Sequence, residues 1–131
     1  MNRVSDNPLL DSLGIQLTSV GPGHCTFELD VQPRHLNRQG TLQGGVSATM
    51  LDAACGYAGL QEEDGTLGQA VTLMLTVSYL GKARAGRLRA VGSVTRAGRR
   101  IYFSSAELLT EAGERIATAQ GTFSRSRITR E

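Results

Sequence analysis

The pattern of hydrophobic and polar residues along the chain predicts one long helix and about six strands. Residues 45–60 are apolar on nearly every side of a helix, so we expect this helix to be buried on most of its faces. Before it, residues 15–20 and 25–31 alternate between apolar and polar positions. The turn sequence Gly21-Pro22-Gly23 separates them, which predicts a hairpin.

Four more strand-like segments follow the helix, at about 69–80, 87–97, 100–110 and 114–124. Turns containing Gly86, Gly98 and Gly113 predict that these strands form an antiparallel meander. The first of the four has apolar residues at alternate positions, which predicts one dry face: Val71, Leu73, Leu75, Val77 and Tyr79. Together the elements predict an α+β fold in which an antiparallel sheet covers one central helix.

The two ends of the chain carry weaker patterns. Residues 7–13 predict a short helix, capped by Asn7 and with Pro8 at its first position, which we expect to be a lid or flank outside the core. Residues after about 124 are rich in Arg and Ser and are expected to fray. We expect residues 1–131 to form a single domain.

Composition and charge exclude several classes of function. With 40% hydrophobic and 20% charged residues the chain is typical of soluble globular proteins, and no apolar run is long enough to cross a bilayer. The N-terminus lacks the apolar core of a signal peptide, so we expect a cytoplasmic protein. A net charge of +2 is too small to indicate a nucleic-acid partner. Cys25 and Cys55 are expected to be small buried residues, and His24 and His35 are too isolated for a metal site.

The segment from Asn37 to Asp52 carries the candidate chemistry. Gly44 and Gly45 open the long helix, where backbone N–H groups are free and the helix dipole favours an oxyanion. Asp52 is the only ionised residue of the helix. Its neighbours at helical spacing are all small, so a thin substrate or another backbone can approach it: Gly45, Ala48, Thr49, Cys55, Gly56 and Gly59.

One chain cannot use both groups on the same carbonyl. Gly44 and Asp52 lie roughly 12 Å apart along a helix that rises about 1.5 Å per residue. If two such helices ran antiparallel about a twofold axis, the glycine loop of one subunit would meet the acid of the other. We therefore predict a homodimer with two shared active sites.

These residues resemble the hotdog-fold acyl-CoA thioesterases, in particular the phenylacetate-degradation branch. The resemblance covers residues from about 14 to 124 and rests on Asn37, Gly40, Gln43-Gly44-Gly45, Asp52, Ala70-Val71-Thr72, Leu80, Arg99-Arg100, Glu114-Arg115-Ile116-Ala117 and Gly121-Thr122-Phe123. It implies a sheet of about six strands wrapped around one long helix, hydrolysis of an acyl-CoA thioester, and a tetramer built from two dimers. No metal or redox cofactor is implied.

The resemblance also implies roles for individual residues. Gly44 would donate its N–H to the thioester carbonyl, and Asp52 of the partner subunit would attack that carbonyl or activate a water. Asn37 would orient the loop or a water, and Thr72 matches a hydroxyl residue near the acid. Gln43 stands where the family usually has histidine. Because glutamine cannot carry a proton at neutral pH, we favour a positional role for this residue.

Substrate-binding residues are predicted around the same segment. Gly45 and Tyr57 are expected to contact substrate, and leucines near Leu9, Leu10 and Leu13 would complete a pocket for an aromatic or medium-length acyl group. Lys82, Arg84, Arg99 and Arg100 are candidates for the phosphates of coenzyme A, although basic residues at strand ends are often simply solvated.

Two other functions fit the same fold. A regulatory domain would bind acyl-CoA without hydrolysing it, an alternative that Gln43 favours and Asp52 argues against. A hydratase or dehydratase would need a histidine paired with an acid, and His24 and His35 lie outside the motif.

Overall fold

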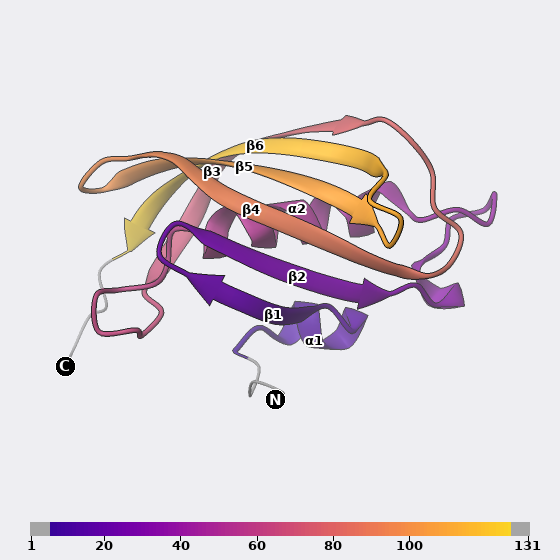
Figure 1. Ribbon diagram of the computed structural model, residues 1–131, viewed down its shortest axis with the longest axis horizontal. Coiled ribbons are helices and arrows are strands. Elements are labelled where there is room, and N and C mark those ends of the chain that lie inside the picture. The colour runs from indigo at the N-terminus through magenta and orange to yellow at the C-terminus, as the bar shows by residue number, and fades with distance from the viewer. Residues whose placement is uncertain (1–5, 127–131) are drawn as a thin grey trace.

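The computed structural model describes residues 6–126, which form a six-stranded antiparallel sheet wrapped around one long helix (Figure 1). The sheet has the order β1-β2-β4-β5-β6-β3. Its strands are β1 (Gln16–Gly21), β2 (His24–Asp30), β3 (Gln69–Tyr79), β4 (Arg87–Ala97), β5 (Ile101–Thr110) and β6 (Arg115–Ser126). The helices are α1 (Pro8–Leu13), a 3-10 turn (Pro33–His35) and α2 (Gly44–Tyr57). The predicted α+β architecture is confirmed.

Helix α2 is sunk deeply into the concave side of the sheet. It ends at Tyr57 rather than near Leu60, and Met50, Leu51 and Ala54 are fully buried against the strands. At Gly92 of β4 the two backbones almost touch, since a Cβ on this glycine would lie 2.1 Å from the carbonyl oxygen of Ala54. Glycine at this point is therefore what allows the helix to lie directly on the sheet.

The predicted meander is wrong for its first strand. Strands β4, β5 and β6 follow one another as expected, but β3 pairs with β6 at the edge, and β4 pairs with β2. The glycine-containing link 80–86 therefore crosses the end of the sheet instead of forming a hairpin. Its seven residues can span about 23 Å, whereas three strand spacings need only about 14 Å.

The course of this link is fixed by backbone hydrogen bonds. Leu80 and Gly81 donate to the carbonyl of Ile116 at the start of β6, and Ala83 accepts from Leu42 in the loop before α2. Gly86 then accepts from Val31, just beyond β2. The link thus passes the beginning of α2 on its way across the sheet.

The predicted dry face of β3 is only partly correct. Leu75 and Val77 pack against the core as expected, but Val71 and Leu73 are more than half exposed. A β-bulge between Thr72 and Met74 interrupts the alternation, so Thr72 and Leu75 both face α2. Because β3 is an edge strand, several of its large apolar side chains stay more than half exposed: Val71, Leu73, Met74 and Tyr79.

Helix α1 is part of the core rather than a loose flank. Asn7 caps it by accepting from the N–H of Leu10, and Leu10 itself is 5% exposed. At its other end Arg34 donates to the carbonyl of Ser12, and the buried His35 donates through Nε2 to the carbonyl of Leu13 at 2.7 Å. The short helix is therefore held at both ends, which agrees with its place beside β1 in Figure 1.

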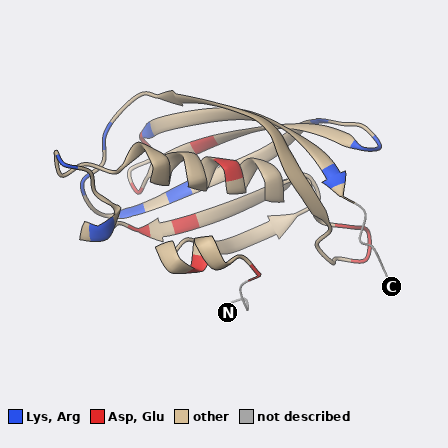
Figure 2. Cartoon of the chain, turned by 180° about the vertical axis from the view of Figure 1, so that it is seen from behind, with Lys and Arg blue, Asp and Glu red and all other residues tan. Residues whose placement is uncertain are grey.

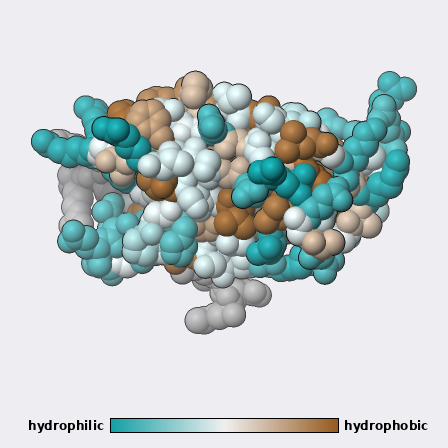
Figure 3. Space-filling model, turned by 45° about the horizontal axis from the view of Figure 1, so that its top comes forward, coloured by the Kyte–Doolittle hydropathy of each residue, from teal (hydrophilic) through white to brown (hydrophobic). Residues whose placement is uncertain are grey.

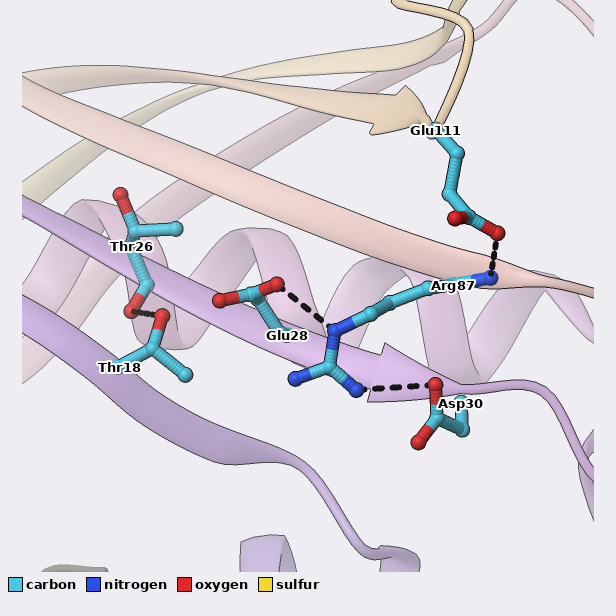
Figure 4. Close-up of polar contacts among 6 residues, drawn as sticks. All are labelled: Thr18, Thr26, Glu28, Asp30, Arg87 and Glu111. Atoms are coloured by element: carbon cyan, nitrogen blue, oxygen red, sulfur yellow. Dashed lines mark hydrogen bonds and ion pairs between the residues drawn. The ribbon is translucent and has the colours of Figure 1, made fainter. Parts of the chain in front are cut away.

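An ion-pair cluster joins β2 to β4 on the outer face of the sheet (Figure 4). Arg87 donates to Glu28 and to Asp30, both at 2.9 Å, and its backbone N–H donates to Glu111. Such exposed pairs contribute about 1 kcal/mol or less each, so the cluster adds little to the stability supplied by the core.

The end of the chain was expected to fray after about residue 124, and no segment was expected to cross a membrane. Arg125 and Ser126 belong to β6 rather than to a frayed tail, and residues 127–131 lie outside the described residues. Within residues 6–126 no helix has both the length and the apolar character needed to span a bilayer.

Replacing Gly92 by alanine should destabilise the fold by about 2 to 3 kcal/mol, because the new methyl group collides with backbone rather than with a flexible side chain. The free energy of unfolding in denaturant measures this. Gly81→Ala is the matched control, since its Cβ would lie at an ordinary 3.4 Å from Ile116, and its effect should stay within about 0.5 kcal/mol. Equal stability of the two variants would contradict the contact.

Candidate functional site

A pocket opens beside α2 around Asp52. Thr49, Asp52 and Tyr57 of α2 line one side, and Thr72 of β3 and Phe123 of β6 line the other. Leu9 and Leu10 of α1 close the end, together with the cap residue Asn7. The rest of the lining is small or apolar, namely Ala53, Gly56, Leu60 and Ala70. The pocket thus combines one carboxylate with mainly apolar walls.

Asp52 is held in place by Thr72. The hydroxyl of Thr72 donates to the Asp52 carboxylate at 2.8 Å, as expected for a hydroxyl residue near the acid. The bulge after Thr72 is what turns both this residue and Leu75 toward the helix. In Figure 2 the acid is the single charged position on α2, and the half-buried carboxylate keeps its second oxygen for other partners.

Tyr57 forms a wall of the pocket, as predicted for a substrate-binding residue. Its hydroxyl donates to Asp6 at 2.9 Å and accepts from Asn7, which ties the end of α2 to the start of α1. The ring meets Phe27 edge to face at 5.0 Å, and burial raises the pKa of Tyr57 above its usual value. The phenol therefore stays protonated and acts as a fixed wall rather than as a base.

The start of α2 presents free backbone donors. Val46 and Ser47 donate their N–H groups to the carbonyl of Gln43, whereas Gly44 and Gly45 have no acceptor for their N–H groups within residues 6–126. The side chain of Gln43 is exposed and makes no cap hydrogen bond. An anion approaching this end would therefore meet two unpaired N–H groups and the positive end of the helix dipole.

Asn37 organises the loop that leads into α2. Its side-chain oxygen accepts from the backbone of Gln39 and Thr41 and from the Thr41 hydroxyl, at 2.9 to 3.2 Å. Gly40 follows with a positive φ of 76°, a conformation that favours glycine. Of the two predicted roles for Asn37, these contacts support orienting the loop.

The structure brings the predicted site residues together in two groups rather than one. Asp52, Thr72 and Tyr57 meet in the pocket, whereas Asn37, Gln43, Gly44 and Gly45 gather at the beginning of α2. Because α2 is straight and rises about 1.5 Å per residue, roughly 12 Å of helix axis separates Gly44 from Asp52. One chain therefore holds two separate groups of candidate site residues.

The predicted basic residues also divide between the two ends of the molecule (Figure 2). Lys82 and Arg84 lie in the link that passes the start of α2, and Arg84 donates to the carbonyl of Gln39. Arg99 and Arg100 lie in the turn between β4 and β5, at the opposite end. Arg125 of β6 is not available for such a role, since it stacks on Tyr102 and donates to the carbonyl of Gly59.

The structure corrects the predicted positions of two other residues near the pocket, Cys55 and Leu13. Cys55 does not share the exposed small strip with Asp52, because it faces the sheet and is fully buried. Leu13 lies beside a separate surface pocket with Arg34 and His35, not in the pocket of Asp52. Both cysteines are free and buried, as expected. Among residues 6–126 no three His, Cys, Asp or Glu side chains are placed to bind a metal.

Sequence reasoning missed Tyr79, whose hydroxyl donates to the carbonyl of Gly44 at 2.7 Å. It also missed Asn7 and Phe123 as pocket residues. The position of Tyr79 at the end of an alternating strand gave no sign of this bond, which depends on where β3 lies in the sheet.

Comparison with known proteins identifies the family of this chain. The Thioesterase superfamily model matches residues 39–117. Human acyl-coenzyme A thioesterase 13 is 34% identical over 110 residues, which cover 82% of this chain and 77% of that protein. The medium/long-chain acyl-CoA thioesterase YigI of Salmonella typhimurium is 28% identical over 130 residues, covering 88% and 84%.

A solved structure shows the same fold. A point mutant of the phenylacetic acid degradation protein PaaI from Thermus thermophilus superposes with a TM-score of 0.81 at 28% identity, covering 92% of this chain and all of that one. The fold is thus that of the hotdog thioesterases. The chain belongs to the thioesterase superfamily, and it is a thioester hydrolase.

The buried thiols should not react in the folded protein. Burial raises the pKa of both Cys25 and Cys55 to about 12, so neither forms the reactive thiolate near pH 8. We expect Ellman's reagent to detect no thiol in the native protein and two after denaturation. Rapid labelling of the native protein would contradict the burial, and the expected result makes the reagent suitable for following release of a thiol product.

Proposed function

We propose that the protein hydrolyses acyl-CoA thioesters to a carboxylic acid and coenzyme A, in sites that two subunits share. The observation that carries this proposal is the separation of the Asp52–Thr72 pair from the free N–H groups at the start of the same helix. The names of the human and Salmonella relatives support the class of substrate. A cytoplasmic location fits a coenzyme A substrate.

The proposed chemistry uses groups of the chain and one water. The Gly44 N–H of one subunit donates to the thioester carbonyl oxygen and stabilises its negative charge as the tetrahedral intermediate forms. Asp52 of the other subunit either attacks the carbonyl carbon, giving an anhydride that water then hydrolyses, or takes a proton from an attacking water. In both routes the C–S bond breaks and coenzyme A leaves as its thiol. This scheme requires no metal or redox cofactor.

The exposed edge of β3 supports a dimer. Its large apolar side chains and unpaired backbone groups would be covered if the β3 strands of two subunits paired about a twofold axis. Figure 3 brings this side of the sheet forward and shows apolar areas among polar ones. Antiparallel α2 helices in such a dimer would set Gly44 of each subunit beside Asp52 of the other. We propose further that two dimers form a tetramer.

The same antiparallel arrangement would bring the two separated pairs of basic residues to one site. Lys82 and Arg84 lie near the start of α2, whereas Arg99 and Arg100 lie near its end, so antiparallel subunits would place both pairs around one shared site. We propose that these residues hold the phosphates of coenzyme A. The acyl group would enter the pocket lined by Tyr57, Leu9 and Leu10.

The apolar walls suit an aromatic or medium-length acyl chain. The PaaI relative favours the aromatic class and assignment to the phenylacetate-degradation branch, whereas YigI favours aliphatic chains. A panel containing phenylacetyl-CoA and hexanoyl-CoA separates the two.

Asp52→Asn should lower the rate of coenzyme A release at least 100-fold, because the amide keeps the shape of the side chain but is neither a base nor a nucleophile. Release is followed with Ellman's reagent. Asp11→Asn in α1 is the control for the loss of one carboxylate and should keep wild-type activity. An Asp52→Asn protein that remains active would contradict the assigned role. Tight binding of acyl-CoA by the wild-type protein without release would instead indicate a sensing domain.

Sharing of the site can be tested with mixed subunits. Gly44→Pro removes one N–H at the first helical position, where proline is tolerated, and Gly44→Ala keeps that N–H as a control. Asp52→Asn and Gly44→Pro should each be inactive alone. Refolded together in equal amounts they should regain about a quarter of wild-type activity, because half of the dimers are mixed and each has one intact site. No recovery in verified mixed dimers would mean that each site belongs to one chain.

A further inference from the structure

The hydroxyl of Tyr79 bonds to the residue that begins α2. Tyr79 is the last residue of β3, and its hydroxyl donates to the carbonyl of Gly44 at 2.7 Å. A Cβ on Gly44 would lie 3.4 Å from the same hydroxyl oxygen, so the phenol rests against this glycine. Tyr79 therefore connects the edge strand to the first turn of the helix.

The backbone groups of Gln43, next to the free donors, are also hydrogen-bonded. The N–H of Gln43 donates to the carbonyl of His35 at 2.9 Å, and the carbonyl of Gln43 accepts from Val46 at 2.9 Å and Ser47 at 3.3 Å. His35 is fully buried. Among the N–H groups of residues 43–47, those of Gly44 and Gly45 have no partner within residues 6–126.

Two consecutive glycines need such restraint. Glycine has no side chain to limit its backbone angles, so a helix that starts with a glycine pair frays easily. The side chain at the N-cap, Gln43, gives no hydrogen bond to the turn. Among the described residues, the hydrogen bond from Tyr79 is the one that joins a side chain of another element to this turn.

We propose that Tyr79 is a positioning residue of the oxyanion site. Its hydroxyl fixes the plane of the Gly44–Gly45 peptide, which sets the direction of the Gly45 N–H. Donation to the carbonyl of this peptide also polarises it and strengthens the Gly45 N–H as a donor. This inference rests on the proposed thioester hydrolysis, and it adds the Gly45 N–H to that of Gly44 as a donor to the developing oxyanion.

The chain offers a matched control for removing this hydroxyl. Tyr102 donates its hydroxyl to the carbonyl of Gly56 at 2.6 Å, so it bonds to the same helix at the opposite end. Tyr79→Phe and Tyr102→Phe each remove one phenol bond to an α2 carbonyl and keep the ring. Tyr102 does not line the pocket of Asp52. In Tyr79→Phe the aromatic ring remains, so the apolar edge of β3 is unchanged.

We expect Tyr79→Phe to lower kcat for acyl-CoA hydrolysis about 10-fold or more, with KM changed less than about twofold, because the lost bond acts on transition-state stabilisation. Tyr102→Phe should retain kcat within about twofold although it also lowers the melting temperature. Equal kcat in Tyr79→Phe and wild type, or equal losses in both variants, would overturn the proposal.

A spectroscopic measurement separates positioning from simple weakening of the fold. The carbonyl stretch of acyl-CoA with ¹³C at the thioester carbon is recorded while bound to Asp52→Asn, which holds the substrate unreacted. The N–H groups should shift this stretch to lower frequency, and Asp52→Asn/Tyr79→Phe should lose a clear part of the shift. An unchanged shift in the double variant would overturn the role of Tyr79. Failure of the proposed function is distinct, because wild-type protein would then release no coenzyme A.

Discussion

The direct contact between the backbones of α2 and β4 is the constraint on which the rest of the structure depends. Ala54 of the helix lies over Gly92 of the sheet, and its carbonyl also accepts a hydrogen bond from the buried Cys25 thiol at 3.0 Å. This contact sets the height of α2 above the strands. At that height Thr72 of β3 reaches Asp52, and Tyr79 of the same strand reaches Gly44. The geometry of both groups of candidate site residues thus follows from the absence of one side chain.

The edge strand β3 has two functions in this arrangement. Its inner face supplies two hydroxyl groups that bond to α2. Thr72, near the beginning of the strand, bonds to Asp52, and Tyr79, at its end, bonds to Gly44. Its outer positions and free backbone edge carry the apolar residues that a second subunit would cover. A strand that belonged to the middle of the sheet could not do both. In the proposed dimer, catalytic geometry and assembly would therefore depend on the same eleven residues.

Much of the fold and part of the site could be predicted from the sequence. The strand segments and the central helix follow from local periodicity, and the pairing of Asp52 with the hydroxyl of Thr72 was implied by the resemblance to the hotdog thioesterases. The order of the strands could not be predicted, because a seven-residue link can be either a hairpin or a crossing and only tertiary packing decides between them. The bulge after Thr72 could not be predicted either, because the sequence of β3 alternates regularly and only its pairing with β6 shows the irregularity. The bond from Tyr79 to Gly44 depends on both of these features and was therefore missed.

The position of β3 at the edge also affects the order in which the chain can fold. As the chain is synthesised, β1, β2 and α2 emerge before β3, but the only strand that pairs with β3 within residues 6–126 is β6, which begins at Arg115. Until β6 has left the ribosome, β3 has no neighbour to fix its register, and its apolar residues have no sheet to join. The nascent chain must therefore keep this segment from aggregating while β4 and β5 are made. The exposed Thr76 and Ser78 and the bulge, which interrupts a long flat edge, serve that need during synthesis as well as in the finished protein.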